Sequence, residues 1–177
     1  NYQYAKELTN QGIIICKSHF SEEHTMIAWA FIQLANISKE LGNYTEAITL
    51  LERSLKTYEK YYGIDSIETA RVLGSLGQVY FRQNSLEKSE ELFQKALKLF
   101  QKSNHPERYM ILENLSDIRL KQSMQAKEKG EVEIAQNFKE EAIDSLKNSM
   151  DLVNTYFPED SPHIIRIQNN LKFLTGE

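Results

Sequence analysis

Apolar residues of this chain recur at helical spacing in segments that share one layout. In "GNYTEAITLLERSL" (42–55), a Gly–Asn break leads into a helix whose apolar side carries Ala47, Leu51 and Leu55. The layout returns 42 residues later in "NSLEKSEELFQKAL" and again near the C-terminus in "EEAIDSLKNSM". Spacings of three and four residues indicate amphipathic helices. A fixed period indicates a repeated structural unit.

The repeated unit is a pair of amphipathic helices separated by a short break. Small residues at Gly77 and Ser89 allow the two helices of one pair to approach each other closely. The chain has only seven glycines and three prolines, and this scarcity of breakers also favours helices over sheets. The pattern predicts eight helices, at about 2–18, 24–41, 44–61, 66–83, 86–102, 107–128, 132–156 and 162–175.

The clearest pair resembles the tetratricopeptide repeat. Its residues are, in order, Leu73-x2-Leu76-Gly77-x2-Tyr80 and then Ser89-x3-Phe93-x2-Ala96. Leu stands for the usual Trp of that family, and Ser for its usual Ala. The 42-residue period and the links "YYGIDSIETA" and "YFPEDSPHII" are similar to the longer repeats of kinesin light chains and their bacterial relatives.

This resemblance implies an all-α fold, an α-solenoid in which antiparallel helix pairs form one superhelical array over residues 1–177. We expect an unpaired helix at 2–18, repeats at 24–61, 66–102 and 107–156, and a final helix at 162–175. The predicted core combines large apolar residues from both helices of each pair: Leu34, Leu51, Leu76, Tyr80, Phe93, Leu115, Leu146 and Leu171.

The third repeat breaks the period because each of its helices is longer. The glycine break follows Leu34 by eight residues, at Gly42, but follows Leu115 by fifteen, at Gly130. Each helix gains seven residues, about two turns, which preserves the facing of the apolar stripe. We therefore predict a projecting hairpin with Gly130 in its turn. Its added segment (121–140) is mostly polar, so it is either a solvated extension or a surface that binds a partner.

The N-terminal helix carries an unusually apolar end. An end helix must hide or solvate its outer face, yet "GIIIC" (12–16) is strongly apolar. This favours a longer parent chain or a dimer that forms through the N-terminal helix. Cys16 is interpreted as a small buried hydrophobe. Because it is the only cysteine, no internal disulfide can form, which fits a cytoplasmic protein.

Composition excludes several classes of partner. The net charge of −4 gives no electrostatic basis for binding nucleic acid or an anionic membrane. No apolar run approaches the roughly 20 residues that a membrane-spanning helix needs. Charged residues at 26% and hydrophobic residues at 41% are ordinary values for a folded protein.

No catalytic motif is present. The segment "HFSEEH" (19–24) has only a superficial likeness to a zinc-hydrolase motif, and we interpret Ser21–Glu22–Glu23 as a helix start. Pro106 and Pro162 suit the first turn of the helices that follow. Phosphate loops, nucleophile elbows and paired cysteines are missing. We therefore expect no enzyme activity, no metal and no cofactor.

The face of each first helix opposite its apolar stripe is the candidate binding surface, and in a solenoid these faces line a concave groove. Its residues are mainly amides, arginines and one tryptophan: Trp29, Gln33, Asn36, Arg71, Ser75, Gln78, Arg82, Asn114, Asp117, Arg166 and Asn170. Amides can pair with both the N–H and the C=O of an extended peptide. The alternative is that these faces bind nothing and are polar only because the outer face of any helix is polar.

The family resemblance supports the same surface. In such domains an Asn placed like Asn114 and Asn170 commonly contacts peptide backbone, although Gln33 and Ser75 hold that position in the other repeats. The arginines suggest a ligand with some acidic character. We therefore expect a non-enzymatic scaffold that binds a partner's peptide segment in this groove. The alternative is a peptide-sensing regulatory domain of a larger protein with a separate output domain.

Overall fold

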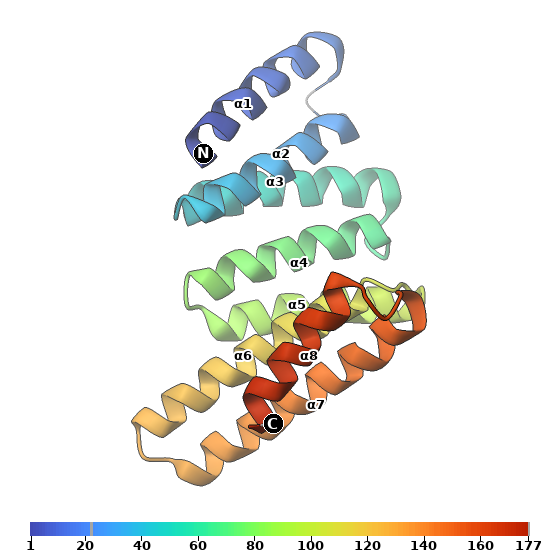
Figure 1. Cartoon of the computed structure of the whole chain (residues 1–177). Coiled ribbons are helices and arrows are strands. Elements are labelled where there is room, and N and C mark those ends of the chain that lie inside the picture. Colours follow the sequence, from blue (N-terminus) through green and yellow to red (C-terminus); the bar gives the residue numbers. More distant parts are fainter. Residues whose placement is uncertain (22, 177) are drawn as a thin grey trace. The chain divides into compact units, whose positions relative to one another are not determined.

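The structure is a computed structural model that describes residues 1–21 and 23–176. Within these residues the chain forms helices and no β-strand, as the sequence predicts. The helices are α1 (Tyr2–His19), α2 (Thr25–Glu40), α3 (Tyr44–Tyr62), α4 (Ile67–Arg82), α5 (Leu86–Lys102), α6 (Arg108–Glu128), α7 (Val132–Tyr156) and α8 (Pro162–Thr175) (Figure 1). Each end lies within one residue of its expected position.

The start of α2 differs from the prediction. The cap is His24 and not Ser21, because Nδ1 of His24 accepts a hydrogen bond from the backbone N–H of Met26 (3.1 Å). His24 is held in place by Phe20, whose ring stacks on the imidazole at 4.3 Å. The predicted role of Glu22 lies outside the described residues.

The two prolines also differ from each other. Pro162 opens α8 at its first turn, where its missing N–H costs nothing, and Ser161 caps this helix. Pro106 instead precedes α6, which begins only at Arg108. The expectation was therefore correct for Pro162 and wrong for Pro106.

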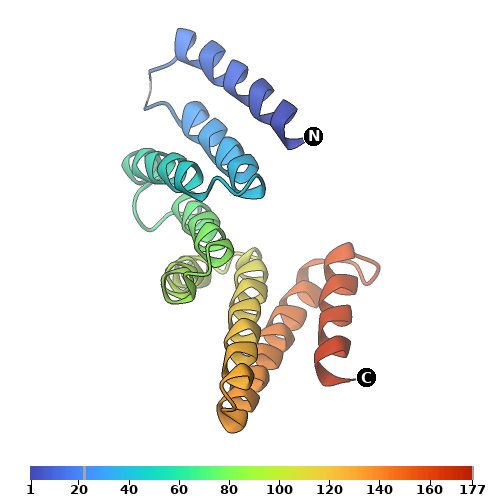
Figure 2. The same cartoon turned by 90° about the vertical axis from the view of Figure 1, so that its left-hand side faces the viewer.

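The chain divides into two compact units, residues 1–99 and 100–177, and the boundary falls within α5. In the N-terminal unit α1 packs on α2, α2 on α3, and α3 on α4, while α2 also contacts α4. In the C-terminal unit α6 and α7 form a long hairpin and α8 packs on α7 (Figure 2). The predicted grouping of these helices into repeats stays a prediction.

Each unit has its own apolar core. Six of the eight predicted core residues are buried: Leu34, Leu51, Leu76, Phe93, Leu115 and Leu146. Tyr80 and Leu171 are only partly buried and pack against the edge of the core. Val79, next to Tyr80 on α4, is more deeply buried (1% exposed), and so is Ile167, one turn before Leu171 on α8 (0%). The apolar face of each helix is therefore turned slightly from the direction that the sequence predicts.

Buried serines fasten the helix pairs together. Oγ of Ser54 on α3 donates to the carbonyl of Ala28 on α2 (2.8 Å), and Oγ of Ser89 donates to the carbonyl of Gly77 on α4 (2.7 Å). Such a bond needs two backbones in close contact, which a larger side chain would prevent. Small residues at these positions therefore set the spacing between helices.

The long hairpin lies where it was predicted, and its helices are five and six residues longer than α2 and α3, slightly less than the predicted seven. Helix α6 has 21 residues and α7 has 25, against 16 for α2 and 19 for α3. Gly130 lies in the turn with φ of +79°, a left-handed conformation that glycine adopts without strain. The extension packs on itself, since Ala126 and Ala135 are buried and Ser123 donates to the carbonyl of Ala135 (2.7 Å).

The apolar end of α1 is only partly buried. Ile13 is buried in the core of the N-terminal unit, and Cys16 is half-buried against it, less than the sequence suggested. Ile14 and Ile15 are 68% and 62% exposed. The outer face of α1 is therefore apolar and open to solvent.

Candidate functional site

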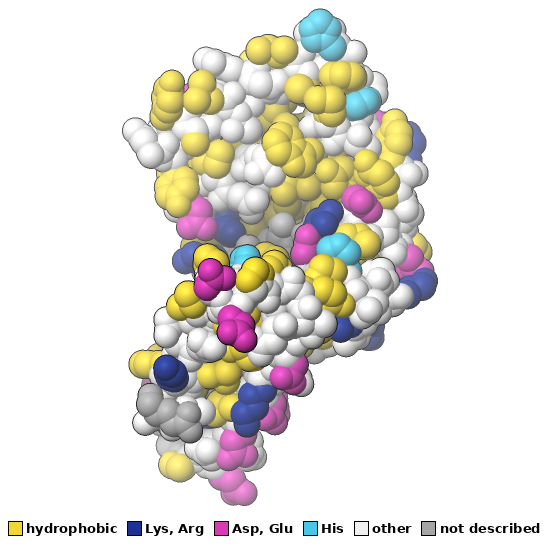
Figure 3. Space-filling view, turned by 45° about the vertical axis from the view of Figure 1, so that its right-hand side comes forward, with side chains coloured by type: hydrophobic (Ala, Val, Ile, Leu, Met, Phe, Trp, Pro, Cys, Tyr) yellow, Lys and Arg dark blue, Asp and Glu magenta, His cyan; other side chains and the backbone are white. Residues whose placement is uncertain are grey.

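The N-terminal unit exposes one face of α2 and α4 that carries seven of the eleven predicted site residues. Trp29, Arg71 and Arg82 are exposed, and Gln33, Asn36, Ser75 and Gln78 are half-buried. Trp29 begins this face and is 59% exposed, although a tryptophan side chain is largely apolar. Hydrophobic side chains gather over the N-terminal unit in the view of Figure 3.

A polar network joins α2 to α4 on this face. The Nζ of Lys39 donates to Oε1 of Gln78 (3.0 Å), and Arg82 Nη2 lies 3.6 Å from Oε2 of Glu40. Lys39 also lies 3.6 Å from Glu40. Partial burial lowers the pKa of Lys39, while Glu40 acts in the opposite direction. Gln78 is thus hydrogen-bonded to α2, and Arg82 lies within ion-pair distance of it.

In the C-terminal unit, α6 and α8 carry the other four predicted residues. Arg166 on α8 forms a two-pronged ion pair with Glu113 on α6: Nε donates to Oε1 (3.0 Å) and Nη2 to Oε2 (2.7 Å). This bond raises the pKa of Arg166. The Tyr109 hydroxyl lies 3.1 Å from Nδ1 of His163, which adds a second link between α6 and α8.

Asp117 and Asn114 are placed one turn apart on α6. Asn114 is half-buried, and its side-chain amide donates to the carbonyl of Met110 (2.7 Å). Asp117 is reached by solvent, but neighbouring protein removes part of its water. This desolvation, with the nearby charge of Glu113, raises the pKa of Asp117 to about 6, against the opposing effect of Arg166. Asn170 is exposed on α8.

Two of the predicted arginines lie near carboxylates of the chain itself, which removes the reason to expect an acidic ligand. Arg82 lies near Glu40 and Arg166 is bound to Glu113, so two of the three predicted arginines already have a carboxylate partner. A preference for an acidic ligand therefore does not follow from these residues. Sequence reasoning did not assign Lys39 or Glu113 to the site. Glu113 precedes Asn114 in the sequence, and Lys39 follows Asn36 by three residues. Which residue each of these side chains reaches depends on the neighbouring helix.

Each unit thus presents its own group of predicted residues, seven in the N-terminal unit and four in the C-terminal unit. One continuous groove across all eleven stays a prediction. Among the described residues, no three metal-ligating side chains come together. No helix in the described part of the chain has both the length and the apolar character to cross a membrane.

A family profile and curated relatives match the repeat region. The profile described as "Tetratricopeptide repeat" matches residues 26–102, which contain α3 and α4, nearly all of α2, and α5. The "Clustered mitochondria protein homolog" of Kluyveromyces lactis is 30% identical over 95 residues, 54% of this chain. The protein of the same name from Vanderwaltozyma polyspora is 30% identical over 108 residues, 58% of this chain. The matching stretch spans about 8% of the length of either relative.

Solved structures of repeat proteins share the fold. The nearly identical TPR-like repeats of a Podosopora anserina kinesin light chain superpose with a TM-score of 0.67 at 19% identity, covering 99% of this chain and 79% of that chain. BtubC (BKLC) of P. vanneervenii superposes with a TM-score of 0.60 at 14% identity, covering 99% and 73%. The chain is therefore an all-α solenoid of the type found in kinesin light chain repeats.

Proposed function

The chain belongs to the tetratricopeptide repeat family over residues 26–102, and from this premise we propose that it is a non-enzymatic scaffold that binds a peptide segment of a protein partner. Proteins with such repeats generally act as scaffolds for protein–protein interaction, using the surface that stacked helices provide. The proposed site is the exposed face of α2 and α4 in the N-terminal unit. The predicted residues of α6 and α8 form a proposed contact surface of the C-terminal unit.

The exposed Trp29 is the observation that carries this proposal. Tryptophan is among the residues that contribute most to binding energy at protein interfaces, and leaving 59% of this side chain in water is unfavourable unless a ligand covers it. Gln33 and Asn36 continue the same face of α2 and are only half-buried. An aromatic anchor followed by amides suits an extended peptide, whose backbone offers both donors and acceptors.

The network at the far end of the face supports a preformed site. Lys39, Glu40, Gln78 and Arg82 contact each other across α2 and α4, so their side chains lose little freedom when a ligand binds. Less ordering on binding leaves more of the interaction energy as affinity. In this proposal Trp29 holds one end of the peptide and the network contacts the other.

The outer face of α1 is a second proposed contact surface, for a second copy of the chain or for a longer parent chain. Tyr4, Leu8 and Ile15 share this face and are 61%, 49% and 62% exposed. In the next repeat, 42 residues on, Leu50 takes the position of Leu8 and is only 8% exposed. The lone Cys16 is consistent with the proposed cytoplasmic setting, in which disulfides are rare.

Peptide display followed by fluorescence tests the proposed site. Peptides are selected on the intact chain and then titrated against it while the emission of Trp29, the only tryptophan, is recorded. We expect a blue shift that saturates, since the indole leaves water on binding. Trp29→Ala should weaken the same peptide about tenfold or more, measured by calorimetry.

Tyr61→Ala is the matched control, because Tyr61 is a similarly exposed aromatic residue (53%) on α3 and outside the proposed face. It should leave peptide affinity unchanged. Equal losses in the two variants, or peptide binding without any change in Trp29 emission, would place the site elsewhere. Melting temperatures of both variants show whether the fold is intact.

A further inference from the structure

The exposed side of α1 has a buried counterpart on α3, which holds the same place in the next repeat. Ala5 and Gly12 correspond to Ala47 and Ser54, 42 residues on in the sequence. Ala47 and Ser54 are completely buried. Helix α2 packs on α3 so closely that Oγ of Ser54 donates to a backbone carbonyl of α2 (2.8 Å). Ala5 and Gly12 are only half-buried, so this side of α1 is open where that of α3 is covered.

Small and large apolar residues alternate along this side of α1. We call them the α1 stripe; they are Ala5, Leu8, Gly12 and Ile15. Their intervals of three, four and three residues place them in one row along a helix. Leu8 and Ile15 are 49% and 62% exposed. A Cβ on Gly12 would meet nothing within 4 Å, so the surface has an open depression there.

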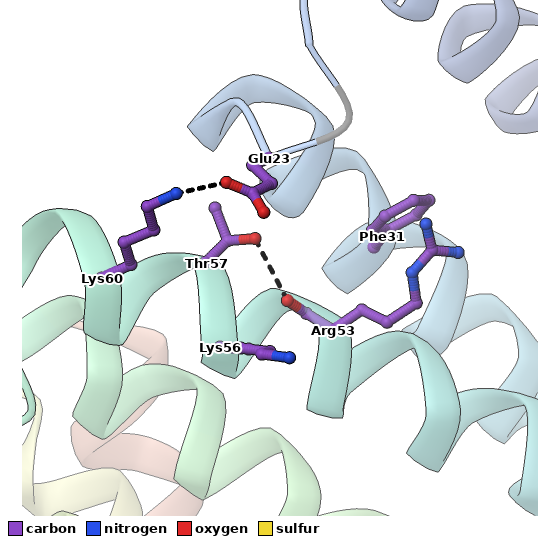
Figure 4. Close-up of a pocket in the computed structure, with 6 residues that line it drawn as sticks. All are labelled: Glu23, Phe31, Arg53, Lys56, Thr57 and Lys60. Carbon is purple, nitrogen blue, oxygen red and sulfur yellow. Dashed lines mark hydrogen bonds and ion pairs between the residues drawn. The ribbon is translucent and has the colours of Figure 1, made fainter.

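The border of the α1 stripe is uncharged where the border of the same side of α3 is basic. On α3 this border lines a cavity of about 360 Å³ beside Phe31 of α2 (Figure 4). Its basic residues are Arg53, Lys56 and Lys60. The residues of α1 at these positions are Gln11, Ile14 and Ser18. Exposed apolar residues without charges around them are typical of a surface that another protein surface covers.

The α1 stripe is complementary to itself when two copies run antiparallel. Ala5 and Ile15 each lie five residues from Asn10, and Leu8 and Gly12 each lie two residues from it. Leu8 of one copy therefore meets Gly12 of the other in an antiparallel pair. Ala5 meets Ile15 in the same way, so each large side chain faces a small one, as knobs-into-holes packing requires. A parallel pair would place Leu8 against Leu8 and Gly12 against Gly12, which gives a clash beside a void.

We propose that two copies of the chain associate through their α1 helices as an antiparallel, two-fold symmetric dimer. In such a dimer both copies use the same surface, which is why the stripe must complement itself. The dimer rests on the proposed contact surface of α1 and names a second copy as its occupant. Peptide binding is independent of it, because Trp29 lies on α2.

Sedimentation equilibrium tests the dimer on the intact chain, from about 1 μM to about 1 mM protein. A reducing agent keeps Cys16 from joining copies through a disulfide. We expect the average mass to rise with concentration from that of one copy to that of two. A mass that stays at one copy over the whole range would overturn the proposal.

Two variants show whether the α1 stripe is responsible. Leu8→Glu should weaken association about tenfold or more, since it places a carboxylate in an apolar contact. Ile64→Glu is the matched control, because Ile64 is an exposed apolar residue (69%) of the same unit, after α3, and should leave association unchanged. Equal losses in the two variants would contradict the proposal. Circular dichroism checks the fold, and Ile15→Gln replaces Leu8→Glu if that variant unfolds.

Cysteine pairs test the antiparallel orientation. Leu8→Cys and Gly12→Cys, each combined with Cys16→Ser, are mixed in equal amounts and oxidised. Disulfides need Cα atoms within about 7 Å, so an antiparallel dimer should give mainly the disulfide between the two variants, identified by its mass. Disulfides formed mainly within each variant, or random pairing, would overturn the proposed arrangement.

The two proposals fail separately. A chain that stays monomeric while a peptide shifts Trp29 emission would reject only the dimer. A chain that forms the dimer while no peptide acts on Trp29 would reject only the peptide-binding site.

Discussion

At the scale of single residues, the close spacing of two helices depends on residues that have a very small side chain or none. Gly77 faces Phe93, which is fully buried. The carbonyl of Gly77 accepts the hydrogen bond from Ser89. A Cβ on Gly77 would lie 2.7 Å from the nearest ring carbon of Phe93. Because Phe93 is packed on all sides, it cannot move away at little cost.

Gly77→Ala should therefore destabilise the protein by ~1–3 kcal/mol through overpacking, measured by urea denaturation. The control is Gly12→Ala in α1, where a Cβ would meet nothing within 4 Å. That change should stabilise the helix by roughly 0.5–1 kcal/mol, since alanine is the better helix former. A neutral Gly77→Ala variant would show that the two helices can separate without cost.

Asp117 is the residue whose ionisation opposes folding. Its pKa in the folded protein is about 6, above the value in an unfolded chain, so the folded state holds the proton more tightly. The stability that this proton provides is present at low pH and is lost as the pH rises through about 6. Glu113 adds to the effect and Arg166 reduces it.

Asp117→Asn should therefore be more stable than the natural chain at pH 8, by ~1 kcal/mol or less because solvent screens an exposed carboxylate. The difference should shrink towards pH 4, where Asp117 is protonated in the folded state. Melting temperatures of both proteins between pH 4 and 8 provide the measurement. A difference that does not change with pH would mean that the effect is not electrostatic.

At the scale of elements, the hairpin of α6 and α7 is held together along its whole length. Ser116 donates to the carbonyl of Ala142 (2.9 Å) near its middle, and Ser149 donates to that of Tyr109 (3.1 Å) near its base. The outer part has its own bond between Ser123 and Ala135. Contacts at the base and middle do not need the outer part.

Removal of residues 123–129 and 132–138 should therefore leave a folded protein. Seven residues amount to about two turns, so the remaining apolar faces of both helices keep their direction. Circular dichroism should show a helical protein with a cooperative transition at a lower temperature, because the small buried contacts of the outer part are lost. As a control, removal of 123–129 alone should be far more damaging, since it destroys the pairing of the two helices.

At the scale of the whole molecule, two separate cores stabilise the two units. Leu76 (4% exposed) belongs to the core of the N-terminal unit, and Leu146 (2%) belongs to that of the C-terminal unit. Trp29 lies in the N-terminal unit, so its fluorescence reports on that unit directly. The two leucines therefore allow the stability of each unit to be examined separately.

Leu76→Ala should lower the stability measured by Trp29 fluorescence by about 2–5 kcal/mol, as expected when a large buried side chain is truncated. Leu146→Ala should shift this signal less, although circular dichroism of the whole chain should respond to both. Equal shifts of Trp29 emission in the two variants would show that the chain unfolds as one unit.

The sequence by itself determined the helices and most of the core. Helical periodicity places Leu34, Leu51 and Phe93 on faces that must be buried, whatever the details of the neighbouring helix. Breaks such as Gly130 are equally local, because a left-handed turn favours glycine in any context. The sequence also placed Trp29 on an exposed face, since that face lies opposite the apolar stripe.

Only the tertiary structure decided which polar side chains meet. Arg166 donates to Glu113 on α6, 53 residues away in the sequence, and Lys39 donates to Gln78 on α4, 39 residues away. The pairing depends on the offset between neighbouring helices, and apolar periodicity does not specify that offset. The cavity beside Phe31 shows the same limit. The basic stripe of α3 is readable in the sequence, but its approach to an aromatic ring of α2 follows from how the two helices pack.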